Sequence, residues 1–110
     1  ALTHEEQARG LMFQKNPTVM TFLYPDFNIR KFWMHNTPAD LAICFLKNNS
    51  IVSICHGKPF DESHIGPNIK TNKVIEFPLS LAKELNISKK TKISIHLDFD
   101  SFKKYCSIKY

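Results

Sequence analysis

The sequence predicts an α+β domain that is mainly β, with an antiparallel, partly closed, barrel-like sheet and two short helices. Its 110 residues suffice for one hydrophobic core and are too few for two. The apolar segments are short and separated by turn residues at hairpin spacing, and no βαβ repeat occurs. We therefore expect a single domain over residues 1–97, followed by a C-terminal extension over residues 98–110.

The N-terminal third carries signals for one helix and two strands. A capping box at residues 3–6 predicts a short helix over residues 5–12. Residues 18–24 are rich in β-branched and aromatic side chains, which predicts a strand that ends at Pro25. A second strand is expected over residues 30–34.

The clearest local signal is a hairpin between residues 41–47 and 50–56. Asn48 and Asn49 between them accept the positive φ angles of a tight turn. If these two residues form the turn, the numbers of opposed residues sum to 97. One face of the hairpin, the expected core face, then carries Ile43, Phe45, Val52 and Ile54.

The second half begins with a segment that reads as a long loop, residues 57–72, because it is rich in proline, glycine and small polar residues. A short strand at residues 74–77, a helix from Pro78 to Leu85 and a strand at residues 92–97 follow. The extension at 98–110 is expected to form a short helix or an added edge strand.

The charge balance favours anionic partners. The net charge is +5, from 15 basic and 10 acidic side chains, and residues 56–110 hold ten of the basic and six of the acidic ones. The lysines are dispersed along the sequence, so we do not expect nucleic-acid binding from charge alone. The basic residues are 13 Lys and 2 Arg, accompanied by eight Asn and eleven Ile, a composition typical of an AT-rich genome such as that of a phage or a low-GC bacterium.

Cysteine usage points to a reducing compartment, and we expect a cytoplasmic protein. Cys44, Cys55 and Cys106 have no CxxC spacing, and the expected register puts the first two diagonally on one face, too far apart for a disulfide. No apolar run is long enough to span a membrane, although a removed leader would leave no trace. No metal site is expected, since the cysteines lack the spacing of a zinc site, and no cofactor is expected, since phosphate-binding and dinucleotide-binding glycine patterns are missing.

Several motifs occur together in an order that resembles a known family. These are Glu6-Gln-Ala-Arg-Gly-Leu-Met12, Phe32-Trp-Met-His-Asn-Thr37, Asp40-Leu-Ala-Ile43, the hairpin, and the stretch from Phe77 to Leu97. Together they resemble the family called domain of unknown function 192 over nearly all of residues 1–97. The resemblance implies a small β-rich domain with a partly closed barrel. That family has no established activity, so the resemblance implies no function.

The sequence also departs from the family pattern. His35 stands where the family usually has Lys, and Ala39 stands where it has Leu. The segment at residues 13–17 is shorter than usual. Residues 57–72 and 98–110 are not obviously shared, so what is particular to this protein is expected there.

A candidate ligand site centres on Trp33, the single tryptophan. Alternation along a strand puts Trp33 and His35 on one face and leaves Phe32 and Met34 for the core. Arg9 could bind a carboxylate or phosphate through two hydrogen bonds, or form an internal ion pair with Asp40. The expected ligand-binding residues are Arg9, Trp33, His35, Asn36, Thr37 and Asp40.

The long loop supplies further polar side chains, and His56, Lys58 and His64 are expected to belong to a lid over that site. Cys55 beside His56 suggests a thiol nucleophile, and the histidines beside Asp61-Glu62 suggest a metal site. Neither spacing matches a known motif. No catalytic residue is therefore assigned.

The leading hypothesis is a non-enzymatic domain that binds a small polar or anionic molecule. The ligand could be a nucleotide, and one concrete version is a phage protein that sequesters a host signalling nucleotide. The alternative is a protein-protein interaction module that uses an edge strand or the C-terminal tail for a protein partner or a second copy. A hydrolase is the third reading. Neither nucleic acid nor membrane is an expected partner.

Overall fold

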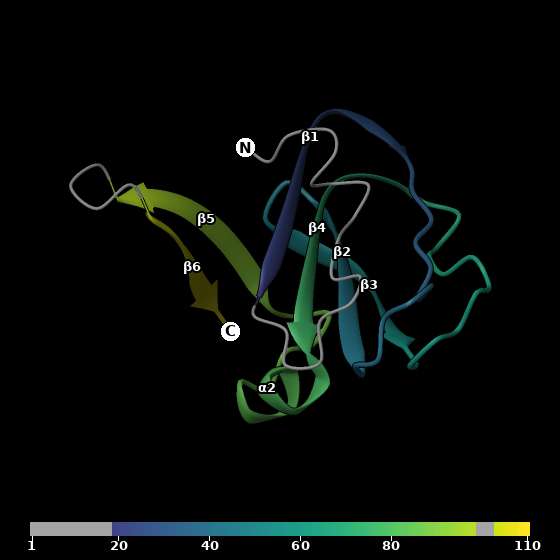
Figure 1. Ribbon diagram of the computed structural model, residues 1–110. Coiled ribbons are helices and arrows are strands. Elements are labelled where there is room, and N and C mark those ends of the chain that lie inside the picture. Colours follow the sequence, from purple (N-terminus) through teal and green to yellow (C-terminus); the bar gives the residue numbers. More distant parts are fainter. Residues whose placement is uncertain (1–18, 99–102) are drawn as a thin grey trace.

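The structure is a computed structural model, of which residues 19–98 and 103–110 are described (Figure 1). The predicted helix at residues 5–12, and Arg9 with it, lies outside the described residues. The elements are β1 (Met20–Ile29), β2 (Leu41–Lys47), β3 (Ser50–Gly57), β4 (Lys70–Pro78), α2 (Leu79–Glu84), β5 (Lys92–Asp98) and β6 (Lys103–Lys109).

The strands form one curled antiparallel sheet in the order β1-β4-β2-β3-β5-β6. This confirms the predicted mainly β, α+β class. The β5–β6 hairpin pairs with β3 at Ser50 and Lys92, and it projects away from the other strands as an arm (Figure 1). The tail thus takes the edge-strand form of the two that the sequence allowed, while the division between residues 97 and 98 stays a prediction.

Strand β2 lies at the centre of the core because both of its faces are covered. Residues 41–46 are all buried, and their side chains alternate between two clusters. The first cluster contains Phe22, Met34, Ala39, Leu41, Ile43, Phe45 and Val74. The second contains Ala42, Cys44, Leu46, Ile51, Ile75, Phe77, Ala82 and Ile93. The segment 30–40 therefore covers one face of the sheet, and α2 covers the other.

The first strand is longer than predicted, and its expected end at Pro25 is wrong. β1 continues to Ile29, with a register shift against β4 between Leu23 and Asn28. Pro25 lies within this irregular stretch. There its missing N–H costs the sheet no ladder hydrogen bond, which is why the strand tolerates it.

The strand predicted at residues 30–34 is not a strand of the sheet. This segment crosses the first cluster and forms an isolated bridge between Phe32 and Ile65. The two residues exchange backbone hydrogen bonds of 2.8 and 2.6 Å. The alternation of core and surface side chains was correct, but the pairing partner is the long loop.

The predicted hairpin and its turn are confirmed, with Asn48 at a φ of 54°. The predicted register is wrong beyond the second pair, because a bulge at Val52 lets Leu46 face Ile51 while Phe45 faces Ser53. Ile54 therefore packs against the second cluster, and Cys55 against the first. Cys44 and Cys55 lie on opposite faces of the sheet instead of sharing one.

The second half follows the predicted order with shifted boundaries. The loop is shorter than residues 57–72, because Gly57 ends β3 and β4 begins at Lys70. α2 follows Pro78 and ends within a residue of its predicted end at Leu85. The helix is short and is held against the sheet by Ala82, which lies in the second cluster.

Candidate functional site

Trp33 is a large side chain that the fold leaves exposed. It retains 48% of its surface, while its neighbour Met34 is fully buried. The indole stacks on the His35 ring, with centroids 4.7 Å apart and an angle of 22° between the planes. The predicted shared face of Trp33 and His35 is therefore present, and it forms a small aromatic platform.

A hydrogen bond to the long loop holds His35. Nδ1 of His35 donates to Oε1 of Glu62 at 2.7 Å, and both side chains are partly exposed. The imidazole is thus held between a carboxylate and the indole ring. Since the ring cannot rotate without losing both contacts, Glu62 indirectly fixes the position of Trp33.

The loop is joined to the Trp33 segment by backbone hydrogen bonds at three places. Besides the Phe32–Ile65 pair, Met34 N donates to Asp61 O at 2.7 Å, and Phe60 N donates to Thr37 O at 3.0 Å. The backbone amide of Ser63 donates to the Asp61 carboxylate and lowers its pKa. The loop is therefore held beside the platform by several backbone hydrogen bonds.

An open pocket of about 280 Å³ lies beside the platform, lined by Lys31, Phe32, Trp33 and His64. Nζ of Lys31 donates to Gly66 O at 2.5 Å and to Asn68 Oδ1 at 2.9 Å. Both acceptors are uncharged, and no carboxylate among the described residues forms an ion pair with this lysine. The pocket therefore keeps a positive charge on its rim.

Gly66 lets the loop approach this closely. Its φ is 150°, and a Cβ atom there would collide with the carbonyl oxygen of Arg30 and crowd the Phe45 ring. A side chain at this position would push the loop away from the segment that carries Lys31 and Trp33.

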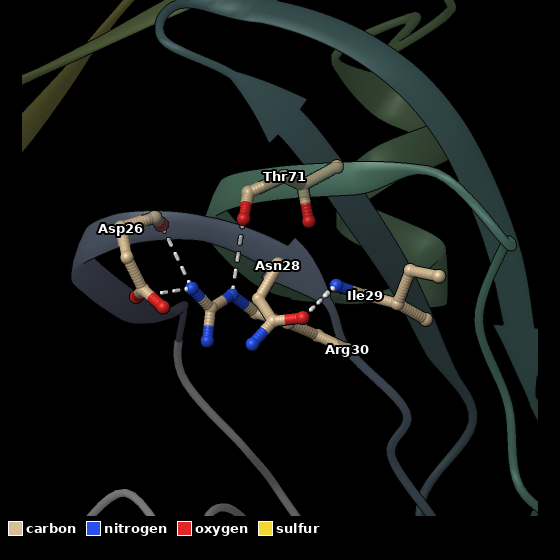
Figure 2. Close-up of polar contacts among 5 residues, drawn as sticks. All are labelled: Asp26, Asn28, Ile29, Arg30 and Thr71. Atoms are coloured by element: carbon tan, nitrogen blue, oxygen red, sulfur yellow. Dashed lines mark hydrogen bonds and ion pairs between the residues drawn. The ribbon is translucent and has the colours of Figure 1, made fainter.

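Arg30, directly before that segment, is held by hydrogen bonds to Asp26 and Thr71 (Figure 2). Its Nε donates to Thr71 O at 3.1 Å, and a terminal nitrogen donates to the carbonyl oxygen and the carboxylate of Asp26, each at 2.8 Å. The guanidinium also lies 3.5 Å above the ring of Tyr24. The hydrogen bond from Arg30 lowers the pKa of Asp26. With 13% of its side chain exposed, Arg30 holds the irregular part of β1 against β4.

The other predicted site residues lie near the platform but make contacts within the protein. Thr37 is 4% exposed, and its hydroxyl donates to His35 O at 3.2 Å. Asn36, half-buried with a φ of 53°, forms part of the turn that follows Trp33. Asp40 accepts a 2.9 Å hydrogen bond from Nε2 of His56. Of the predicted lid residues, His64 lines the pocket and the exposed Lys58 lies outside its lining.

Sequence reasoning missed Lys31 and Glu62 as members of this site. Lys31 could have been found, because side chains alternate along an extended segment and residues 31, 33 and 35 therefore lie on the same side. Glu62 could not, since its contact with His35 joins residues 27 positions apart.

Comparison with known proteins gives the family. Residues 1–95 match the family model DUF192, described as uncharacterised ACR. The chain belongs to this family. None of the curated proteins matches it.

Two solved structures share the fold of this DUF192 domain. One is a protein of unknown function from Novosphingobium aromaticivorans, 28% identical, with a TM-score of 0.69 over 98% of this chain and 70% of the other. The second is described as a putative transcription regulator from Sinorhizobium meliloti, 22% identical, with a TM-score of 0.73 over 80% of this chain and 72% of the other. At that identity, the second likeness shows the fold alone.

In this DUF192 domain, the two residues that suggested nucleophilic chemistry, Cys55 and His56, lie on opposite faces of the sheet. Cys55 packs against the first cluster, whereas His56 follows it on β3 and therefore points to the opposite face. The two do not form the thiol-imidazole pair that their adjacency suggested.

Burial raises the pKa of the Cys44 thiol to about 12. Within residues 19–98 and 103–110, no cluster of three metal-ligating side chains and no helix able to span a membrane occurs.

Proposed function

We propose that this DUF192 domain binds a small anionic molecule that carries a planar ring, and that it does so without catalysis. The exposed indole of Trp33, fixed against His35 and placed beside the uncompensated charge of Lys31, is the observation that carries the proposal. The ring of the ligand would stack on Trp33, and its anionic group would pair with Lys31.

The platform suits ring stacking because it is both apolar and held in place. A free tryptophan side chain would lose rotamer freedom when a ligand stacked on it, and a fixed one has already lost that freedom. Here the His35 ring and the bond from Glu62 hold the indole before any ligand arrives. Base-aromatic stacking contributes about 1–3 kcal/mol in other proteins, enough to select a ligand that has a ring.

The electrostatics of the pocket suit an anion. Lys31 and His64 line it, and the Lys31 ammonium is bonded to neutral oxygens that do not cancel its charge. The nearest acidic partner of the platform, Glu62, is engaged with His35. A phosphate or carboxylate would therefore gain a charge-assisted hydrogen bond from Lys31.

The size of the pocket suits a small ligand. Its volume of about 280 Å³ is just below the lower end of the range for drug-sized molecules, so one ring with one anionic group is the expected scale. A nucleotide combines these features, and it is the finer form of the proposal. Sequestration of a host signalling nucleotide by a phage protein is the most specific version, suggested by the composition of the chain.

Calorimetric titration of the full chain with AMP, GMP and inorganic phosphate tests the proposal. A mononucleotide should bind the parent protein, and Trp33→Ala and Lys31→Gln should each weaken binding about tenfold or more. Lys83→Gln, on α2 at the opposite face of the sheet, is the charge-matched control and should bind like the parent. Arg9→Ala tests whether Arg9, the predicted site residue that lies outside the described residues, contributes to binding. Equal binding by the parent and both pocket variants would contradict the proposal.

An interaction module remains the second candidate because β6 is an edge strand. Edge strands can add a strand from another protein, although lysines such as Lys109 discourage such pairing. A pull-down with the chain shortened after Asp98, and with Trp33→Ala, separates the two candidates. A partner protein that binds Trp33→Ala but does not bind the shortened chain would favour the interaction module, provided that the shortened chain is folded.

A further inference from the structure

The strand register gathers lysines that are scattered along the sequence. Lys47 faces Ser50 across the β2–β3 turn, Ser50 faces Lys92 on β5, and Lys92 faces Lys109 on β6. Residues opposite each other on neighbouring strands point to the same face of a sheet. All four are exposed. We call Lys47, Ser50, Lys92 and Lys109 the lysine row.

The row is carried by a well-bonded part of the fold. The backbone amide of the turn residue Asn48 donates to Oδ1 of Asn72 on β4 at 2.7 Å, and Oδ1 of Asn48 accepts from Nδ2 of Asn72 at 3.3 Å. The next turn residue, Asn49, accepts from Nζ of Lys73 at 2.8 Å and, through its carbonyl oxygen, from Ile93 N at 2.8 Å. Strands β4 and β5 are thus tied to the turn between β2 and β3, which fixes the spacing of the row.

The row is electrostatically unfavourable for the protein by itself. Lys92 and Lys109 lie directly opposite each other, and like charges in that position destabilise a sheet. None of the three lysines pairs with a carboxylate among the described residues. Lys89 and Lys90, both exposed in the turn before β5, add two more charges close by. Such an arrangement is expected where an anion from outside the protein supplies the missing partner.

We propose that the lysine row binds the phosphate backbone of single-stranded nucleic acid. Strand spacing in a sheet is about 4.8 Å, so the row spans about 14 Å, the length of a few nucleotides. The serine hydroxyl between the lysines can donate to a phosphate oxygen as well. The dispersed lysines gave no reason to expect nucleic acid, and the register that collects them could not be read from the sequence.

An exposed aromatic ring favours a single strand over a duplex or a simple polyanion. Tyr110 directly follows Lys109 at the outer edge of the sheet and is 70% exposed, and its hydroxyl donates to Leu85 O at 2.5 Å. Its ring therefore lies on the α2 side of the sheet, opposite the lysine row, so a strand that contacts both must cross the edge formed by β6. This bond anchors the end of the side chain and leaves most of it accessible. Unpaired bases stack on such rings, whereas the bases of a duplex are already stacked on each other. Polyphosphate has no base to stack.

The proposal does not depend on the small-molecule pocket. The pocket is lined by residues 31–33 and 64, whereas the row lies at the turn between β2 and β3 and on the β5–β6 arm. Loss of one activity would leave the other, so variants of each site distinguish them.

Fluorescence anisotropy with a labelled 20-nucleotide oligo-dT tests the proposal on the full chain. Lys92→Gln and Lys109→Gln should each weaken binding about fivefold, and each should reduce the slope of log affinity against log salt by about 0.7. Lys58→Gln, at the opposite end of β3 from Ser50, removes the same charge and should leave both values unchanged. Tyr110→Leu should weaken binding of oligo-dT and leave binding of inorganic polyphosphate unaffected.

The opposite results overturn the proposal. The first is that oligo-dT does not bind at 50 mM salt. The second is that Lys58→Gln weakens binding as much as the row variants do. The third is that Lys31→Gln abolishes binding, which would assign the oligonucleotide to the pocket. Binding of a duplex or of polyphosphate as tightly as oligo-dT would also contradict it. Circular dichroism of each variant confirms that it is folded, as expected for substitutions of exposed side chains.

Discussion

Glu76 on β4 is a buried carboxyl group that needs a physical explanation. Its side chain is 5% exposed and lies opposite Ile43, on the face of the sheet that carries the first cluster, and its Oε1 has no hydrogen-bond partner within the described part of the chain. Burial raises its pKa from 4.5 to about 7. The pKa of Tyr24 is also raised, by burial first and by the charge of Glu76 to a lesser extent, while Arg30 lowers it.

This shift predicts that stability falls as the pH rises from about 4.5 to 7. Below 4.5 the carboxyl is protonated in both states; between the two values the unfolded chain releases the proton while the folded chain keeps it. A shift of this size corresponds to about 3 kcal/mol of unfolding free energy, lost across that window. Glu76→Gln should remove this loss and be the more stable protein at pH 8.

Urea denaturation of both proteins at pH 4.5 and pH 8 measures the effect, and the difference between the two proteins isolates the contribution of Glu76. Asp26 and Asp61 have lowered pKa values, so their contributions are lost at more acidic pH. An identical pH dependence in the parent and Glu76→Gln would show that Glu76 is not the responsible group.

At the residue scale, the sequence predicted side-chain direction better than side-chain partners. Alternation placed Met34 in the core and Trp33 beside His35, because that pattern depends on neighbouring residues. The Asp40–His56 bond and the His35–Glu62 bond could not be predicted, since each joins distant residues. For Asp40 the sequence suggested an ion pair with Arg9, which lies outside the described residues, so that pair stays a prediction; among the described residues the partner of Asp40 is His56.

At the element scale, the hairpin shows what local signals can and cannot determine. Asn48-Asn49 identified the turn and both strands, but the bulge at Val52 shifted the register and moved Ile54 and Cys55 to the faces opposite those expected. A bulge satisfies the packing of both faces at once, and turn chemistry carries no information about it. For the same reason, β-propensity at residues 30–34 predicted an extended chain correctly and its sheet pairing wrongly.

The opposed lysines of the β5–β6 arm give a prediction about stability. Replacing Lys109 with Thr removes the repulsion with Lys92 and introduces a residue that favours strands. We expect a gain of about 0.2–1 kcal/mol in the free energy of unfolding, largest at low salt. Thermal denaturation at 20 mM and 500 mM NaCl measures it, with Lys58→Thr as the control. A loss of stability, or a gain that salt does not reduce, would contradict this account of the arm.

At the scale of the whole molecule, the class of fold followed from the sequence, but the position of the candidate site did not. Short strands at hairpin spacing indicate an antiparallel sheet, and the sheet observed is of that kind. The order of its strands, with β4 between β1 and β2, depends on long-range packing. So does the crossing of segment 30–40 over the first cluster, which brings Trp33 against the loop.

The central claim is that Trp33 forms the surface on which an anionic, ring-bearing ligand stacks. Because Trp33 is the single tryptophan, the intrinsic fluorescence of the unmodified protein reports on that surface directly. Titration with AMP and GMP should quench the emission saturably, and inorganic phosphate should compete. Emission that stays constant at ligand concentrations at which calorimetry detects binding would place the ligand elsewhere and contradict the claim.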